Sequence, residues 1–134
     1  YILFLNPDAF LSNNFLEKAE AFLEKKEEEK TAVVSGILLE YDIVNDRPTG
    51  RIDSSGIFRK WYGNWYDRAQ GQKYQKPLFT KVESVPALCG ALMFCRKEAL
   101  DSILLKPNEV WDNSFFMYKD DIDLSLRLKK KKWQ

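Results

Sequence analysis

Three carboxylates within four positions, Asp120, Asp121 and Asp123, constrain this chain more than any other feature of its sequence. Like charges this close repel one another, so the backbone around them must compensate. A helix that begins near Asp120 does so, because the positive end of its dipole lies at the first turn. Arg127 and the lysines at 129–132 then lie near the helix C-terminus, where cations are favoured. The charge pattern therefore predicts a helix that starts near Asp120.

The apolar residues of this segment fit two patterns. The positions that alternate with polar residues, as in a strand, are Ile122, Leu124, Leu126 and Leu128. The same four residues form two i,i+4 pairs, which make two opposite apolar ridges on a helix. Because the second pattern agrees with the charges, we predict a helix that is buried on both sides.

The opposite end of the chain predicts a strand. Residues 1–5 are apolar throughout, as in a fully buried strand, and Asn6-Pro7-Asp8 follows at the carboxyl end. In open α/β sheets ligands bind outside the carboxyl ends of strands, where a carboxylate can hold a hard divalent cation. Taken alone, Asn-Pro-Asp is better explained as a turn, since all three residues favour turns.

Composition sets bounds on both fold and function. A length of 134 residues predicts one domain, and a net charge of +1 gives no argument for nucleic acid or for a general membrane-surface preference. No apolar run is long enough to span a membrane. The chain has no histidine, so acid–base chemistry must use carboxylates. Cys89 and Cys95 are predicted to be reduced, buried thiols.

Between the two ends, local patterns predict several further elements. In chain order these are an amphipathic helix over 12–30 capped by Ser12 or Asn13, a strand over 31–39, a hairpin or long loop at 46–50, a short strand over 82–86 and a short helix from residue 96.

Residues 52–74 are rich in tryptophan, tyrosine, glycine and basic residues. Such a segment can form an aromatic minicore, contact a sugar or pyrophosphate, or stack nucleic-acid bases. For Trp61 and Trp65 the minicore is preferred, and for Asp67–Gln72 a loop on the substrate side. Nucleic acid ranks last because the chain is nearly neutral.

Gly90 and Ala91 are small residues between bulky ones. Small residues in this context indicate a close backbone approach to another group. Two partners fit equally well at this stage: a bound substrate, or another element of the same chain.

Six segments, taken in order, resemble the family 2 glycosyltransferases, especially their bacterial rhamnosyltransferase-like branch. They are Leu5-Asn6-Pro7-Asp8, Ile52-Asp53-Ser54-Ser55-Gly56, Asp67-Arg68-Ala69-Gln70-Gly71-Gln72, Cys89-Gly90-Ala91-Leu92-Met93-Phe94-Cys95-Arg96, the stretch from Phe115 to Arg127, and Trp133. The order of the segments makes the resemblance specific. The chain departs from the family pattern at three positions. Ala69 replaces the glycine of Asp-Arg-Gly, Asp120 replaces the glutamate of Glu-Asp, and Lys132 replaces the glycine of the closing Gly-Trp.

The resemblance implies an α/β fold, a GT-A-like mixed sheet with flanking helices. Residues 1–134 would be a single-domain fragment, the metal- and acceptor-binding half of the enzyme, truncated so that the N-terminal nucleotide-binding βαβ half is missing. The first strand would then have lost its neighbours. This predicts an exposed sheet edge through which the chain self-associates.

The activity implied is inverting, metal-dependent transfer of a sugar from a nucleotide-sugar donor to a glycan or lipid-linked acceptor, with the fragment alone inactive. Asp8 would bind Mg²⁺ or Mn²⁺, Asp121 would be the general base, and Asp120 would assist it. The donor- or acceptor-binding residues implied are Asn6, Asp67, Arg68, Gly90, Ala91, Trp111 and Arg127. The implied location is cytoplasmic, including the inner face of the membrane. The alternative is a carbohydrate- or protein-binding module that uses the aromatic loop 52–74 without catalysis.

Overall fold

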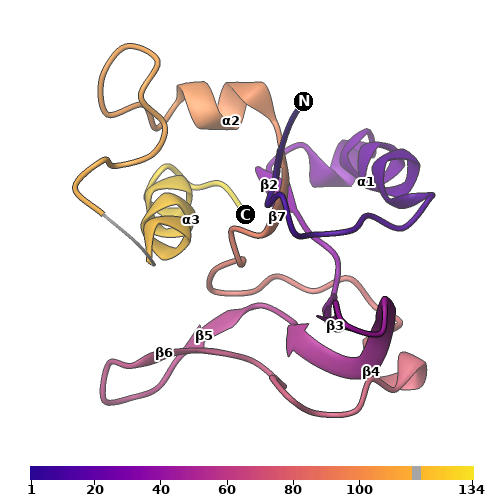
Figure 1. Cartoon of the computed structure of the whole chain (residues 1–134). Helices are drawn as coiled ribbons and strands as arrows, with labels where there is room; N and C mark the ends of the chain where they lie inside the picture. The colour runs from indigo at the N-terminus through magenta and orange to yellow at the C-terminus, as the bar shows by residue number, and fades with distance from the viewer. Residues whose placement is uncertain (116–118) are drawn as a thin grey trace. The chain divides into compact units, whose positions relative to one another are not determined.

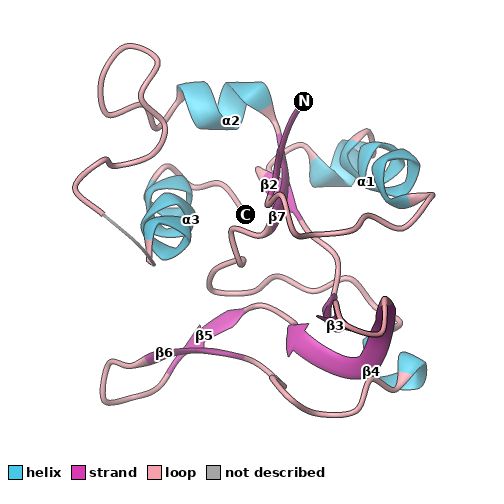
Figure 2. Ribbon diagram, in the orientation of Figure 1, coloured by secondary structure: helices cyan, strands magenta, loops and turns pink. Residues whose placement is uncertain are grey.

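The computed structural model describes residues 1–115 and 119–134. Phe116, Met117 and Tyr118 of the predicted 115–127 stretch lie outside the described residues. The chain is a mixture of short helices and strands joined by long loops (Figures 1 and 2). It forms two compact units, which we call unit 1 (Tyr1–Ser35 with Leu88–Gln134) and unit 2 (Gly36–Ala87).

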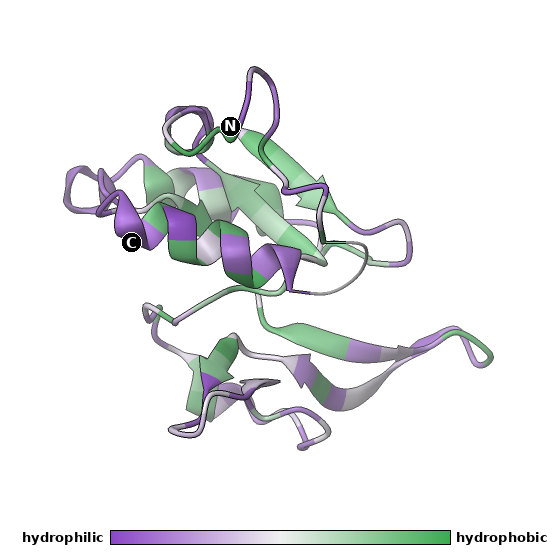
Figure 3. Ribbon diagram, turned by 90° about the vertical axis from the view of Figure 1, so that its left-hand side faces the viewer, coloured by the Kyte–Doolittle hydropathy of each residue, from purple (hydrophilic) through white to green (hydrophobic). Residues whose placement is uncertain are grey.

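Unit 1 contains a three-stranded antiparallel sheet with predominantly hydrophobic strands (Figure 3). β7 (Leu92–Cys95) lies in the middle, between β1 (Ile2–Leu5) and β2 (Val33–Val34). All of β7 is buried. The predicted N-terminal strand is confirmed, but the expectation that it is fully buried is wrong, because β1 is an edge strand of this sheet and its Leu5 is 38% exposed.

The helix predicted over 12–30 is shorter than expected. α1 spans Phe15–Leu23, and a separate 3₁₀ turn, η1, spans Lys26–Glu28. The N-cap residue is Asn14 rather than Ser12 or Asn13, and its side chain makes no capping hydrogen bond. Ala19 and Leu23 pack against Phe94, whereas the charged residues that follow have no apolar face to hold them in one continuous helix.

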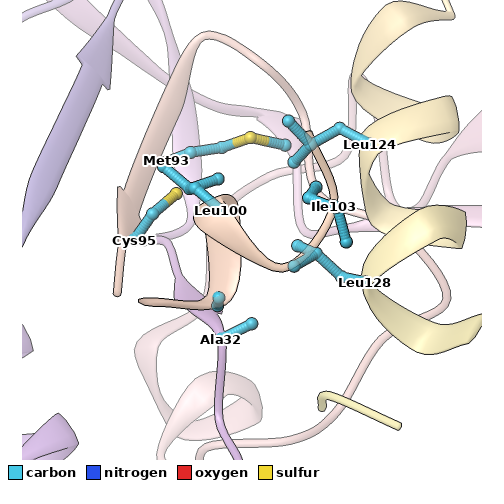
Figure 4. Close-up of a cluster of buried hydrophobic side chains, with 8 residues drawn as sticks. Ala32, Met93, Cys95, Leu100, Ile103, Leu124 and Leu128 are labelled. Atoms are coloured by element: carbon cyan, nitrogen blue, oxygen red, sulfur yellow. The ribbon is translucent and has the colours of Figure 1, made fainter. Parts of the chain in front are cut away.

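The core of unit 1 lies between β7, α2 (Lys97–Asp101) and α3 (Asp120–Lys130) (Figure 4). Its buried members are Ala32, Met93, Cys95, Ala99, Leu100, Ile103, Leu124 and Leu128. α2 confirms the short helix predicted from residue 96. Cys95 is a buried thiol, as predicted, and burial raises its pKa to about 12. Cys89 is only partly buried, so the prediction of burial is wrong for this residue.

α3 confirms the helix predicted to start near Asp120, with three carboxylates in its first turn and basic residues in its last. The expectation of burial on both sides is confirmed only in part. Leu124 and Leu128 of one ridge are buried, and so is Ile122 of the other ridge, whereas Leu126 is 45% exposed. Ile122 and Leu124 point in nearly opposite directions, so the helix is covered on both sides at its first turn but not at Leu126.

Two predicted strands differ from the observed ones. The segment 31–39 is divided between β2 in unit 1 and β3 (Leu38–Asp42) in unit 2. No strand forms over 82–86, within the described part of the chain, and only the isolated bridge of Ala87 to Ile57 follows it. Val82 is 73% exposed and Pro86 has no N–H to donate. The segment is therefore neither buried nor able to form the complete set of hydrogen bonds of a strand.

Unit 2 consists of two hairpins and a 3₁₀ turn. β3 pairs with β4 (Arg47–Ser54), β5 (Ile57–Arg59) pairs with β6 (Trp65–Asp67), and η2 spans Lys76–Phe79. The turn of the first hairpin lies before residue 47, because the Asp42 carboxylate accepts hydrogen bonds from the amides of Val44 and Asn45. The hairpin is confirmed, with its turn earlier than the predicted 46–50.

The aromatic minicore predicted for Trp61 is wrong, because this side chain is 96% exposed. Trp65 is partly buried, with the Arg59 guanidinium 5.9 Å from its ring centroid. Among the described residues, no helix combines the length and the apolar character needed to cross a bilayer.

Helix α3 ends in a Schellman motif built on Lys132. The Lys132 amide donates to the Lys129 carbonyl at 2.9 Å and the Trp133 amide donates to the Leu128 carbonyl at 3.1 Å. Lys132 has φ +66°, the left-handed conformation that favours glycine. Ala69, in the turn after β6, has φ +63°. At both positions the family pattern has a glycine that this chain lacks.

We expect Lys132→Gly and Ala69→Gly each to raise the free energy of unfolding by about 1 kcal/mol, since glycine relieves the left-handed strain of a side chain. Chemical denaturation measures this change. Lys131→Gly is the matched control, because Lys131 has φ −87° and glycine there only adds freedom to the unfolded chain. A Lys132→Gly variant no more stable than Lys131→Gly contradicts the prediction.

Candidate functional site

Residues 88–90 bind to one face of α3. The Gly90 amide donates to Asp121 Oδ2 at 2.9 Å, and the Leu88 amide donates to Ser125 Oγ at 3.3 Å. Asp121 and Ser125 are four residues apart, so they lie on the same helix face and meet alternate amides of the segment. The two hydrogen bonds fix the start of β7 against the first turns of α3.

Gly90 approaches Asp121 so closely that a side chain has little room. A Cβ on Gly90 would lie 3.3 Å from the Asp121 Cβ and 3.6 Å from Oδ2. The element that Gly90 packs against is therefore the start of α3, which is the second partner considered for the small pair. A substrate contact by Gly90 and Ala91 stays a prediction.

The N-terminal motif meets the same segment. The Asn6 amide donates to the Ala91 carbonyl at 3.0 Å, directly beyond the Leu5–Leu92 register pair. The Ala9 amide donates to the Asn6 carbonyl at 3.1 Å, so Asn6-Pro7-Asp8 forms the expected turn. The exposed Asp8 lies on this turn. The structure thus gathers Asn6, Gly90, Ala91 and Asp121 from three distant segments.

The Asp121 carboxylate also takes part in the start of its own helix. Its Oδ1 accepts the amide of Ile122 at 2.8 Å. The N-cap residue, Lys119, has φ +71° and makes no side-chain capping bond, so the carboxylate satisfies one of the open amides of the first turn. Two backbone amides therefore orient a partly buried carboxylate.

Asp120 and Asp123 differ from Asp121 in their surroundings. Asp123 Oδ2 accepts from Arg127 Nε at 2.7 Å, an i,i+4 ion pair in which the side chains are 28% and 16% exposed. Asp120 is partly buried at the first position of α3. It precedes Asp121 directly in the chain, and its assisting role stays a prediction.

Arg127 holds together the loop that precedes the site. Its Nη1 donates to the Ile103 carbonyl at 2.8 Å and its Nη2 donates to the Val110 carbonyl at 2.7 Å. All three guanidinium nitrogens thus make contacts within unit 1, which explains the residue structurally. Its predicted substrate contact stays a prediction.

Trp111 packs its ring edge-on against Phe4 of β1, with centroids 5.0 Å apart. It belongs to the margin of the unit 1 core. In the next residue, Asp112, hydrogen bonds from Ser114 hold the pKa of the carboxyl below its usual range. A turn on the N-terminal side of the acidic stretch therefore forms close to β1.

Asp67 and Arg68 belong to unit 2, whereas the other candidate residues belong to unit 1. Arg68 donates to Ser55 Oγ at 2.9 Å and to the Ser55 carbonyl at 2.8 Å, and it forms an ion pair with Glu83. Asp67 Oδ1 is buried and has no hydrogen-bond partner among the described residues. Arg68 therefore stabilises its own hairpin, and both substrate roles stay predictions.

A resident metal centre is not formed by the described residues, among which no three histidine, cysteine, aspartate or glutamate side chains gather around a common point. Mg²⁺ commonly binds through one or two carboxylates and keeps its other positions for water and substrate phosphates. A single exposed carboxylate on a turn, Asp8, fits a cation that binds together with a diphosphate.

Two further residues, whose roles the sequence patterns did not indicate, organise unit 1. Ser125 is 6% exposed and accepts a hydrogen bond from the Leu88 amide. Its position four residues after Asp121, on the same face of the predicted helix, was the feature of the sequence that could have indicated this role. Arg96 donates to the Thr31 carbonyl at 2.9 Å and the Glu28 carbonyl at 3.2 Å, and also to that of Leu23, which ties the end of α1 to β7. Nothing in the local pattern around Arg96 indicates these partners.

No family model, no curated protein and no solved structure matches this chain. The family resemblance therefore depends on the ordered motifs, and the activity it implies is a proposal.

Proposed function

We propose that this chain carries the acceptor side of an inverting, metal-dependent glycosyl-transfer site, which moves a sugar from a nucleotide-sugar donor to a glycan or lipid-linked acceptor. The observation that carries the proposal is the hydrogen bond of the Asp121 carboxylate to the Gly90 amide, beside the bond between Asn6 and Ala91. Three of the motif segments meet there, although they are far apart in the sequence.

Asp121 is suited to the role of general base by its orientation. Two amides hold the carboxylate, and each oxygen of a carboxylate has two lone pairs, so an oriented carboxylate can also accept from a substrate hydroxyl. The acceptor oxygen forms its bond to the anomeric carbon as its proton passes to Asp121. The bond from that carbon to the donor phosphate breaks, and the nucleoside diphosphate leaves from the opposite face.

Asp8 is the residue that would hold the divalent cation. Mg²⁺ or Mn²⁺, when bound, supplies positive charge that stabilises the departing diphosphate. The amide of Asn6 donates to the carbonyl of Ala91, which follows Gly90, the residue bonded to Asp121. The turn that carries the Asp8 carboxylate is therefore linked through the backbone to the segment that contacts Asp121.

Two of the non-glycine residues with a left-handed backbone also support the motif alignment. Lys132 and Ala69 adopt backbone conformations that favour glycine, at the two positions where the family pattern places glycine. The backbone at these two positions therefore has the conformation expected of a glycine, although the residues themselves differ from the family pattern.

The alternative function is a binding module without catalysis. It is supported by the exposed side chains of Trp61 and Tyr62, which are 96% and 53% accessible to solvent. It predicts glycan binding that is unchanged when Asp8 or Asp121 is replaced. The catalytic proposal predicts dependence on both.

Calorimetric titration of Mn²⁺ with UDP- and dTDP-sugars tests the proposal in the protein that carries this chain at its natural length. We expect nucleotide-sugar binding that requires the metal and is lost in Asp8→Asn. Glu17→Gln, an exposed carboxylate on α1, is the control and should bind as the unmodified protein does. Metal-independent binding, or none, contradicts the proposal.

A further inference from the structure

The tip of the β5–β6 hairpin is a closed, well-defined turn. The Lys60 amide donates to the Asn64 carbonyl at 2.8 Å, and the Gly63 amide donates to the Lys60 carbonyl at 2.9 Å. The Arg59 side chain donates to the Gly63 carbonyl at 3.3 Å, and Gly63 supplies φ +101°. Residues 61 and 62 are therefore held at the end of a hairpin (Figure 1).

This tip exposes large aromatic side chains. Trp61 is 96% exposed, Tyr62 is 53% exposed and Tyr66 is 42% exposed. The rings of Trp61 and Tyr62 meet edge to face, with centroids 5.4 Å apart. Neighbouring aromatic rings left in water at a turn are typical of a surface that binds another surface.

Cations accompany the aromatic rings. The Lys60 ammonium lies 5.6 Å from the Tyr62 ring centroid and 5.5 Å from that of Tyr66. Arg59 is also exposed, next to Lys60 in the chain. The acidic residue of this hairpin, Asp67, lies at the far end of β6 from the tip. The tip is thus aromatic and positively charged, although the whole chain has a net charge of only +1.

We propose that this tip, defined as residues 59–62, binds the surface of an anionic lipid bilayer. Tryptophan and tyrosine concentrate at the level of lipid headgroups, where an apolar ring and a polar edge are both satisfied. Lysine and arginine are attracted to anionic lipids. A fully exposed tryptophan at a hairpin tip suits a flat interface, whereas sites for small ligands are concave. Lipid binding is independent of the proposed sugar transfer.

The other hairpin of unit 2 supplies a natural contrast. At its turn Ile43 is 77% exposed and Val44 is 93% exposed, and the turn is coloured hydrophobic in Figure 3. Its charged neighbours are Asp42, Asp46 and Arg47, so this turn has a net negative charge, which an anionic surface repels. Both turns expose apolar side chains but carry net charges of opposite sign, so comparing them separates the role of the cations from that of hydrophobicity alone.

Co-sedimentation with vesicles tests the proposal, using phosphatidylcholine alone and phosphatidylcholine mixed with phosphatidylglycerol. We expect binding to the mixed vesicles that weakens with salt. Trp61→Ser should weaken it about tenfold, and Arg59→Gln with Lys60→Gln about fivefold per charge. Val44→Ser, the matched control, should bind as the unmodified chain does. All four altered side chains are exposed, and thermal melting verifies that each variant is folded.

Absence of binding to the mixed vesicles overturns the proposal, as does binding that the Trp61 and Arg59/Lys60 variants leave unchanged. Capture by soluble glycans that is lost in Trp61→Ser, without vesicle binding, also overturns it and assigns the tip to sugar recognition. Because neither Asp8 nor Asp121 is altered, these outcomes are distinct from failure of the proposed transferase activity.

Discussion

Asp121→Asn is expected to lower the rate of sugar transfer by about 10²–10⁴-fold, the usual contribution of a general base. Asparagine has one acceptor oxygen, so it keeps only one of the two bonds from the Gly90 and Ile122 amides, and it cannot take up the proton of an acceptor hydroxyl. The melting temperature should therefore fall modestly and the metal-dependent binding of the nucleotide sugar should change little, while turnover is lost.

Steady-state transfer assays and thermal melting on the same samples make this comparison, in the protein at its natural length. Asp123→Asn is the control from the same helical turn. Asp123 pairs with Arg127, so its replacement should lower the melting temperature more than the rate. Turnover that survives in Asp121→Asn would remove the assignment of the base.

Leu124→Ala is expected to lower the free energy of unfolding by about 3 kcal/mol, because it removes buried methyl groups and leaves a cavity. Leu124 is 0% exposed and belongs to the cluster that joins α3 to β7 and α2 (Figure 4). The loss of packing also loosens the helix that carries Asp121, so transfer activity should fall at temperatures where the variant begins to unfold.

Leu126→Ala provides the matched control, since the residue type, the helix and the substitution are the same. Leu126 is 45% exposed, and we expect a cost below about 1 kcal/mol. Urea denaturation of both variants measures the difference. Equal costs would contradict the burial of Leu124 and the exposure of Leu126, and would favour the alternating, strand-like pattern of this segment.

Several elements follow from interactions within a few residues. The acidic first turn and basic last turn of α3 stabilise its two ends, and Asp42 closes the β3–β4 turn through the next residues of the chain. Such elements were predicted correctly because the groups that stabilise them are neighbours in the sequence. Their boundaries shifted, as at α1, where the charged tail separates from the helix.

Other features depend on partners that periodicity does not reveal. The alternation of leucines in α3 did not indicate that Leu126 faces solvent, and the aromatic composition of 52–74 did not indicate that Trp61 does. A sequence pattern shows which residues share a side of an element, but the opposing surface decides whether that side is covered.

By itself, the sequence determined the mixed helix and strand content, the helix at the acidic stretch and the turn at Asn6-Pro7-Asp8. Only the tertiary structure decided that Gly90 packs against Asp121, that Arg127 binds the carbonyls of 103 and 110, and that residues 31–39 divide between two units. The physical reason is range: capping and turn formation join near neighbours, whereas these contacts join groups from distant parts of the chain, whose meeting depends on how the whole chain packs.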